Sequence, residues 1–202
     1  MFLALSEMAT DFIRRLVPMV LLLLGSDILA QEDPEPRDPR EYFFTQSFGD
    51  FPEELTEAKK AGKIGLMLFF EQDGCAYCRA MMNKVLNQRP VQDWYGKRFV
   101  SIAVDIRGDV ELTDFDGVTL PSKAFAIQRR TVMTPVITFI DLNGSEIFRK
   151  WGMISTPEEF LLMGAYIEEK RYLDISFDDY ARQKGREPGP EVFLTPVDGH
   201  EQ

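Results

Sequence analysis

The sequence predicts an α/β protein with a central mixed sheet of about four to five strands flanked by helices. Three observations support this fold class. Helix-like and strand-like segments alternate along the chain, two early strands are almost continuously apolar, and an Asn-Gly pair joins the last two strands as a hairpin. Crossover connections followed by a closing hairpin place parallel and antiparallel strands in one sheet, with helices on both faces.

The first half of the predicted domain contains two helices and two strands. Asp50 can cap the first helix, Pro52 fits its first turn, and Gly62 can end it. The apolar runs IGLMLFF and FVSIAVD are typical of strands that are buried on both faces. In chain order, the expected elements are a helix over residues 50–62, a strand over 64–70, a helix over 76–87 and a strand over 99–105.

The second half adds two strands and three helices. Asn143 and Gly144 favour a tight hairpin turn, and Thr156 forms a capping box with Glu159. The acidic stretch of residues 109–116 lacks the spacing and terminal Glu of an EF-hand loop, so we interpret it as a solvated insertion. The expected elements are a helix over residues 122–127, strands over 136–141 and 146–150, a helix that starts at the capping box, and a short helix over 177–184.

Residues 1–30 have the pattern of a signal peptide. A pair of arginines precedes a short apolar run over residues 16–25, and Ala30 supplies a small residue before the expected cut. A membrane-spanning helix needs about 20 apolar residues, and Asp27 interrupts the run before that length. We therefore expect export to the periplasm, with an uncleaved membrane anchor as the less favoured alternative.

The remaining chain divides into a linker, one domain and a tail. Residues 31–45 are charged and Pro-rich and are expected to be a tether without a core of its own, and residues 46–184 form the domain. Residues 185–202 have a similar composition, contain the only histidine, His200, and are expected to be disordered. We expect the protein to be a monomer.

Composition excludes one class of partner. The formal charge is −10, whereas a nucleic-acid-binding surface needs clustered Lys and Arg to contact phosphates. Hydrophobic residues make up 45% of the chain, which is ample for a packed core. We expect no nucleic-acid partner and no cofactor.

The chain has two cysteines, Cys75 and Cys78, and they lie where a buried strand gives way to a helix. In open α/β sheets, functional sites gather at the carboxyl ends of the strands. The first turn of a helix offers unpaired N–H groups and the positive end of the helix dipole, which together stabilise a thiolate. Cys78 is expected one turn further into the helix and less exposed.

Other uses of the pair are weaker. A disulfide that closes so small a loop stabilises a protein by only about 2 kcal/mol, which disfavours a purely structural bridge. Structural zinc needs four ligands, and the chain offers neither a second cysteine pair nor the two histidines required. We therefore expect no metal site, although Cu(I) binding by the two thiolates stays open as a minor alternative.

Thr134 and Pro135 form the second candidate feature. Pro135 begins the third core strand, and proline suits a first strand position because it cannot donate to the sheet. A redox pair also needs an adjacent surface where the extended chain of a partner can dock, and this pair of residues is a candidate for it.

These features together resemble the thioredoxin superfamily. The resemblance rests on a strand followed by Cys-Ala-Tyr-Cys, a Thr-Pro pair before a later strand, the sequence DLNG and a final amphipathic helix. It covers the chain from Phe51 to Tyr172. Within the superfamily, residues 134–172 most resemble the exported thioredoxin-like proteins that are associated with bacterial sulfur oxidation.

The resemblance implies a dithiol–disulfide exchange centre. Cys75 would attack a partner disulfide as a thiolate, and Cys78 would resolve the mixed disulfide. Pro135 would match the cis-proline of the family, and the backbone of Thr134 would hydrogen-bond an extended segment of the partner.

Ala76 and Tyr77, between the cysteines, are the remaining candidate substrate contacts. They replace the Gly-Pro of typical cytosolic thioredoxins, so the strength as a reductant does not transfer. Many thioredoxins also place a buried carboxylate six residues before the first cysteine, where this chain has Phe69. Glu71 lies nearby, and we expect its side chain to be solvated at the strand end.

The expected activity is that of an exported thioredoxin-like protein disulfide oxidoreductase. By the resemblance, it would act as a reductant on protein disulfides and receive electrons from a membrane thiol carrier. The alternatives are an oxidase or isomerase of protein disulfides, or a thiol-based copper metallochaperone. The isomerase is disfavoured because the segment before Phe51 is too short for a separate dimerisation domain.

Overall fold

A four-stranded mixed sheet forms the centre of the structure, a computed structural model that describes residues 35–186. The strand order is β2-β1-β5-β6, in which β1 and β2 are parallel and the other two pairs are antiparallel. The strands are β1 (Gly65–Glu71), β2 (Phe99–Asp105), β5 (Val136–Asp141) and β6 (Glu146–Trp151). The predicted α/β fold class with a mixed sheet is confirmed.

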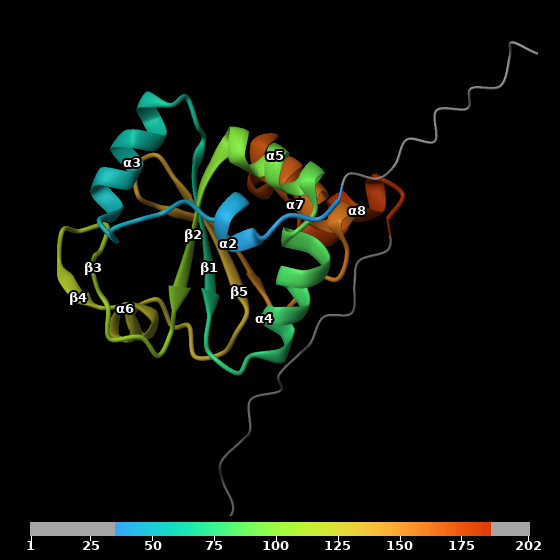
Figure 1. Cartoon of the computed structure of the whole chain (residues 1–202). Coiled ribbons are helices and arrows are strands. Elements are labelled where there is room, and N and C mark those ends of the chain that lie inside the picture. Colours follow the sequence, from blue (N-terminus) through green and yellow to red (C-terminus); the bar gives the residue numbers. More distant parts are fainter. Residues whose placement is uncertain (1–34, 187–202) are drawn as a thin grey trace, which may run out of the picture. The chain divides into compact units, whose positions relative to one another are not determined.

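Helices cover both faces of this sheet (Figure 1). Alternate residues of β1 point to opposite faces: Leu66 and Leu68 belong to one buried cluster, and Met67 and Phe69 to the other. The first cluster includes α3 (Phe51–Lys60) and α6 (Ser122–Gln128). The second includes α4 (Ala76–Met81), α5 (Arg89–Arg98), α7 (Pro157–Glu168) and α8 (Phe177–Gln183).

The helix predicted over residues 76–87 is divided. It consists of α4 and a π-helical turn, Met82–Leu86, which continues it directly. A further short element, the 3₁₀ turn Arg171–Leu173, links α7 to α8. Both cysteines therefore belong to α4 and its N-cap, before the π-helical turn.

Helix α5 was not predicted. Its N-cap residue, Gln88, makes no side-chain capping bond, so Pro90 in the first turn is left as the local signal for a helix start. Tertiary contacts stabilise it instead, since the buried Tyr95 hydroxyl donates to the Phe160 carbonyl of α7 at 2.6 Å. Burial raises the pKa of Tyr95 well above its ordinary value, so the hydroxyl keeps this proton.

The acidic insertion is more structured than expected. It forms a hairpin of β3 (Glu111–Thr113) and β4 (Thr119–Pro121), and the side chain of Leu112 is buried. The carboxylate of Asp114 accepts the N–H groups of Asp116 and Val118, both at 2.9 Å, and so closes the turn. The acidic residues therefore serve in part to shape the loop.

Residues 35–45, hereafter the N-terminal strap, are folded onto the domain, which corrects the linker expected over 31–45. Asp38 caps the short helix α2 (Pro39–Tyr42), and Phe43 and Phe44 after it are buried in the same cluster as the cysteines. The Thr45 N–H donates to Ser101 of the edge strand β2 at 2.8 Å. Burying two Phe side chains offsets the cost of ordering the polar residues around them.

The predicted leader, residues 31–34 of the predicted linker, and residues 187–202 of the predicted tail, including His200, lie outside the described residues. Within 35–186, no helix is long and apolar enough to cross a membrane.

Replacing Phe43 with Ala tests whether the strap belongs to the folded domain. The Phe43 ring lies 5.7 Å from that of Tyr95 and 5.9 Å from that of Phe160, so we expect its loss to lower the free energy of unfolding by about 3 to 4 kcal/mol. The matched control is Phe48→Ala, because Phe48 is 99% exposed and should change stability by less than about 0.5 kcal/mol. Guanidinium unfolding measures both, and equal midpoints would contradict the docking of the strap.

Candidate active site

The two cysteines lie just beyond the carboxyl end of β1, at the start of α4. Gly74 adopts a φ of +76°, a left-handed conformation that glycine takes without strain, and its N–H bonds the Asp73 carboxylate at 2.8 Å. This turn redirects the chain from the strand into the helix, and Cys75 becomes the N-cap residue of α4. The location agrees with the sequence-based expectation.

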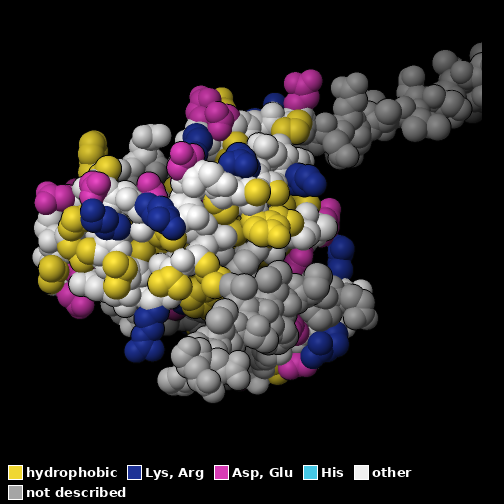
Figure 2. All heavy atoms as spheres, turned by 90° about the horizontal axis from the view of Figure 1, so that it is seen from below, with side chains coloured by type: hydrophobic (Ala, Val, Ile, Leu, Met, Phe, Trp, Pro, Cys, Tyr) yellow, Lys and Arg dark blue, Asp and Glu magenta, His cyan; other side chains and the backbone are white. Residues whose placement is uncertain are grey.

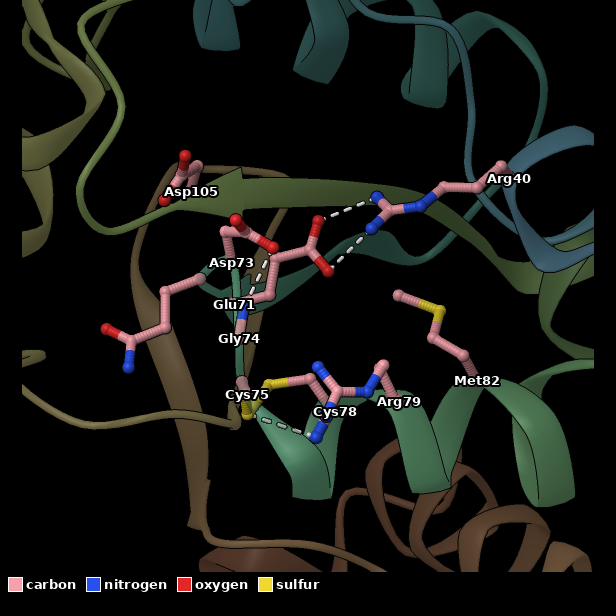
Figure 3. A pocket seen from close by; sticks show the side chains of 10 residues that line it. Arg40, Glu71, Asp73, Gly74, Cys75, Cys78, Arg79, Met82 and Asp105 are labelled. Carbon is pink, nitrogen blue, oxygen red and sulfur yellow. Dashed lines mark hydrogen bonds and ion pairs between the residues drawn. A yellow bond between two sulfur atoms is a disulfide. The ribbon is translucent and has the colours of Figure 1, made fainter.

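Cys75 and Cys78 form a disulfide with a Cα–Cα distance of 5.3 Å (Figure 3). The Cys75 sulfur also accepts the backbone N–H of Cys78 at 3.0 Å. Cys75 is 8% exposed and Cys78 is 3% exposed, so the difference in burial has the expected direction but is small. In the reduced protein the same N–H group would stabilise a Cys75 thiolate, because a hydrogen bond to the charged form lowers a pKa.

Ala76 and Tyr77 are exposed at the first turn of α4. Tyr77 is 63% exposed. Both residues directly follow Cys75 in the sequence, so they lie next to the N-cap of α4. Their role as substrate contacts stays a prediction.

The face of the sheet behind the sulfurs is apolar. Phe69, at the position of the carboxylate found in many thioredoxins, is fully buried, and its ring lies 5.8 Å from that of Phe44 in the strap. Both rings belong to the buried cluster that includes Cys75 and Cys78. The Phe69 side chain has no basic group, so it cannot replace that carboxylate as a proton acceptor for Cys78.

Glu71 is not simply solvated at the end of β1, which corrects the sequence-based expectation. Its side chain is 14% exposed and forms a two-pronged ion pair with Arg40 of the strap. Glu71 lies two residues after Phe69 on the same strand, so both side chains point to the face that α4 covers. The carboxylate is therefore held on the cysteine side of the sheet.

A pocket of about 300 Å³ opens beside the disulfide. Figure 3 shows the two sulfurs on one side of it and the Arg40–Glu71 pair on another. Charged groups of both signs line it together with the sulfurs. The lining residues are Arg40, Glu71, Gln72, Asp73, Gly74, Cys75, Cys78, Arg79, Met82 and Asp105.

Thr134 and Pro135 lie at the same end of the sheet. The peptide bond between them is cis, and Val136, directly after Pro135, pairs with Phe70 near the end of β1. Pro135 is buried, and its carbonyl accepts the N–H of Gly152 at 2.9 Å. Neither residue lines the pocket, so the pocket and the Thr134–Pro135 segment are separate features at the same end of the sheet.

Exposed apolar side chains occur near this segment. Val132 is 75% exposed, and Trp151, the register partner of Val136, is 43% exposed. Figure 2 looks from below at the sheet end toward which β1 and β2 point, and it shows several patches of hydrophobic side chains among the atoms that are not grey. Such a surface suits contact with another polypeptide.

Sequence reasoning missed the roles of Arg40, Asp73, Arg79 and Asp105 in the pocket, and it expected Glu71 to be solvated. A signal for the strap was present, because Asp38 followed by Pro39 is typical of a helix start and two Phe residues follow. No comparable signal linked Arg40 to Glu71. Among residues 35–186, no cluster of three or more His, Cys, Asp or Glu side chains could hold a metal ion.

Comparison with known proteins gives a family and a set of distant structures. A family model described as a thioredoxin-like domain matches residues 51–168. A thioredoxin-fold protein from Helicobacter pylori has 21% sequence identity and a TM-score of 0.52, covering 72% of this chain and 88% of that one, which supports the fold alone. A comparison with curated proteins finds no match.

Two further structures have lower TM-scores. A thioredoxin from Thermus thermophilus has 25% identity and a TM-score of 0.44, with 67% of this chain and 91% of that one covered. The reduced C-terminal domain of DsbD from Neisseria meningitidis has 18% identity and a TM-score of 0.41, with coverages of 55% and 89%. Because the family model spans more than half of the chain, the protein belongs to the thioredoxin-like domain family.

Proposed function

We propose that this chain is a thiol–disulfide oxidoreductase that exchanges the Cys75–Cys78 pair with disulfides of partner proteins. One observation carries the proposal: the Cys75 sulfur lies at a helix start, accepts the Cys78 N–H, and is bonded to the Cys78 sulfur. A structural bridge would gain little from so short a loop. Membership of the thioredoxin-like family supports the same class of activity.

The reaction balances as a transfer of two electrons. The Cys75 thiolate attacks one sulfur of the partner disulfide, that bond breaks, and the departing partner thiolate takes a proton. Cys78 then loses its proton and attacks the Cys75 sulfur of the mixed disulfide, which releases the second partner sulfur as a thiolate that is protonated in turn. The partner is reduced to two thiols, and Cys75–Cys78 becomes a disulfide.

The partner would approach as an extended segment. Thr134 can offer its backbone to such a segment beside the disulfide, in the manner of strand addition, and Pro135 shapes the backbone at that point. Ala76 and Tyr77 would contact the same segment from the other side of Cys75. The exposed apolar residues near β5 and β6 support binding of a polypeptide over a small thiol.

We further propose that the protein works as a monomeric reductant in the periplasm, of the type associated with bacterial sulfur oxidation. The leader-like residues 1–30 support export. A membrane thiol carrier would return two electrons to the Cys75–Cys78 disulfide. The intact mass of the exported protein tests the leader: a chain that begins at Gln31 is expected, and one that keeps residues 1–30 would contradict the cut.

A Cys78→Ser variant should accumulate the mixed disulfide with a partner. Reduced full-length protein is mixed with insulin as the probe, and the adduct is measured by mass spectrometry under non-reducing conditions. At pH 7 the adduct through Cys75 should form at least about tenfold faster than the adduct of the control variant Cys75→Ser, because only Cys75 is expected to be largely ionised. Equal or faster trapping by Cys78 would overturn the assigned roles.

The reduction potential tests the direction of electron flow. Full-length protein is equilibrated in dithiothreitol buffers of known potential, and the fraction of Cys75–Cys78 disulfide is quantified after alkylation. A reductant should have a potential near that of thioredoxin, about −270 mV. A value near −120 mV, which is that of a strong oxidant, would instead show that the protein delivers disulfides to its partners.

A further inference from the structure

Arg40 and Glu71 form an ion pair in which each of the two terminal guanidinium nitrogens contacts a different carboxylate oxygen. The Nη1–Oε1 distance is 2.6 Å and the Nη2–Oε2 distance is 2.7 Å. Such two-pronged pairs fix the geometry of both partners as well as their charges. Arg40 belongs to the N-terminal strap, outside the residues 51–168 that match the family model.

The pocket beside the sulfurs brings together charged groups from five parts of the chain. They are Arg40 from α2, Glu71 from the end of β1, Asp73 from the following loop, Arg79 from α4 and Asp105 from the end of β2. Three carboxylates thus face two guanidinium groups. Loss of Arg40 would leave the three carboxylates with one cation, and an anionic sulfur there would be less favoured.

The other two carboxylates are engaged locally. Asp105 accepts the N–H of Arg107 at 2.9 Å, and Asp73 accepts the N–H of Gly74 at 2.8 Å. Both residues are exposed, whereas the Glu71 side chain is 14% exposed. Glu71 therefore has the least exposed carboxylate of the three, and solvent screens its charge least.

The surroundings of the sulfurs determine how strongly this charge balance affects the ionisation of Cys75. Phe69 and the aromatic residues of the strap desolvate the sulfurs from the sheet side, which disfavours a thiolate. The N–H of Cys78 favours it. Because these two effects oppose each other, the net charge of the side chains that line the pocket decides how readily Cys75 ionises.

We infer that Arg40 is a positioning residue of the redox centre: by pairing with Glu71 it cancels the carboxylate that faces the cysteines and so favours the ionised Cys75 sulfur. The inference deepens the proposed function and rests on it. It makes the N-terminal strap a part of the site, in addition to its role in the core.

The test removes the charges of Arg40 and Glu71 singly and together and measures the pKa of the Cys75 thiol. Full-length protein carrying Cys78→Ser, which leaves one thiol, is combined with Arg40→Gln, Glu71→Gln or both, and thiolate absorbance is titrated. Arg40→Gln should raise the pKa of Cys75 by about half a pH unit to one pH unit, and Glu71→Gln should lower it by a similar amount. The double variant should return close to the parent, and Arg40→Lys should keep most of the effect of the native charge.

The matched control is Arg37→Gln. Arg37 anchors the same strap through Asp93 at 2.6 Å and Gln92 at 2.7 Å but does not line the pocket, so the pKa of Cys75 should stay unchanged. If Arg37→Gln shifts the pKa as much as Arg40→Gln, the effect comes from displacement of the strap and the inference is wrong. The inference would also be overturned if Arg40→Gln and Glu71→Gln shifted the pKa of Cys75 in the same direction, or if neither variant shifted it.

The outcomes for the two proposals are separable. If Cys75 has a low pKa in the Cys78→Ser parent and the charge variants do not change it, the inference about Arg40 is wrong and the proposed function is not affected. A parent pKa near that of free cysteine, with variants that still diverge as described, supports the inference and counts against the proposed function. In 1 M salt the divergence should shrink, because the screening length falls to about 3 Å.

Discussion

The hydrogen bond from the Cys78 N–H to the Cys75 sulfur is the interaction on which the rest of the site depends. It exists because β1 ends at Glu71, Gly74 turns the chain, and Cys75 takes the N-cap position of α4. A capping residue normally offers an oxygen to the first turn of its helix. Here the capping atom is a sulfur, so the contact that begins the helix is also the one that can stabilise a reactive thiolate.

Two opposing effects act on that sulfur. The apolar face around Phe69 raises the cost of a charge, and the helix start together with Arg40 lowers it. Thioredoxins with a buried carboxylate behind the cysteines place a titrating group within the sheet, whereas here a carboxylate that is ion-paired with Arg40 lies at the carboxyl end of β1. This arrangement separates the packing of the core from the electrostatics of the site, because Phe69 can be fully buried while Glu71 remains paired at the pocket.

Much of the fold could be predicted because its signals are local. The apolar runs at β1, β2 and β5 and the capping box of α7 lie within single elements, and the structure places these within a residue of the predicted bounds. Helix α5 and the β3–β4 hairpin escaped prediction because tertiary contacts, such as that of Tyr95 with Phe160, stabilise them more than their own sequences do. The strap escaped for a related reason, since its charged and Pro-rich composition concealed two anchoring Phe residues.

The residues of the candidate site likewise fall into those that the sequence could predict and those that it could not. Cys75 and Cys78 were found because a strand end and a helix start are visible in the sequence. Arg40 was not, because it meets Glu71 across 31 positions of the chain, and only the packed strap brings them together. The charges of a site are thus harder to predict than its nucleophile, because several distant segments supply them.

Partial alkylation of the reduced wild-type protein tests the central claim most directly. At pH 7, less than one equivalent of iodoacetamide is added and the modified peptides are identified by mass spectrometry. We expect the label almost entirely on Cys75, at a rate whose pH dependence gives a pKa well below that of free cysteine, which is about 8.5. Equal labelling of the two cysteines, or a rate that rises only above pH 8, would contradict it.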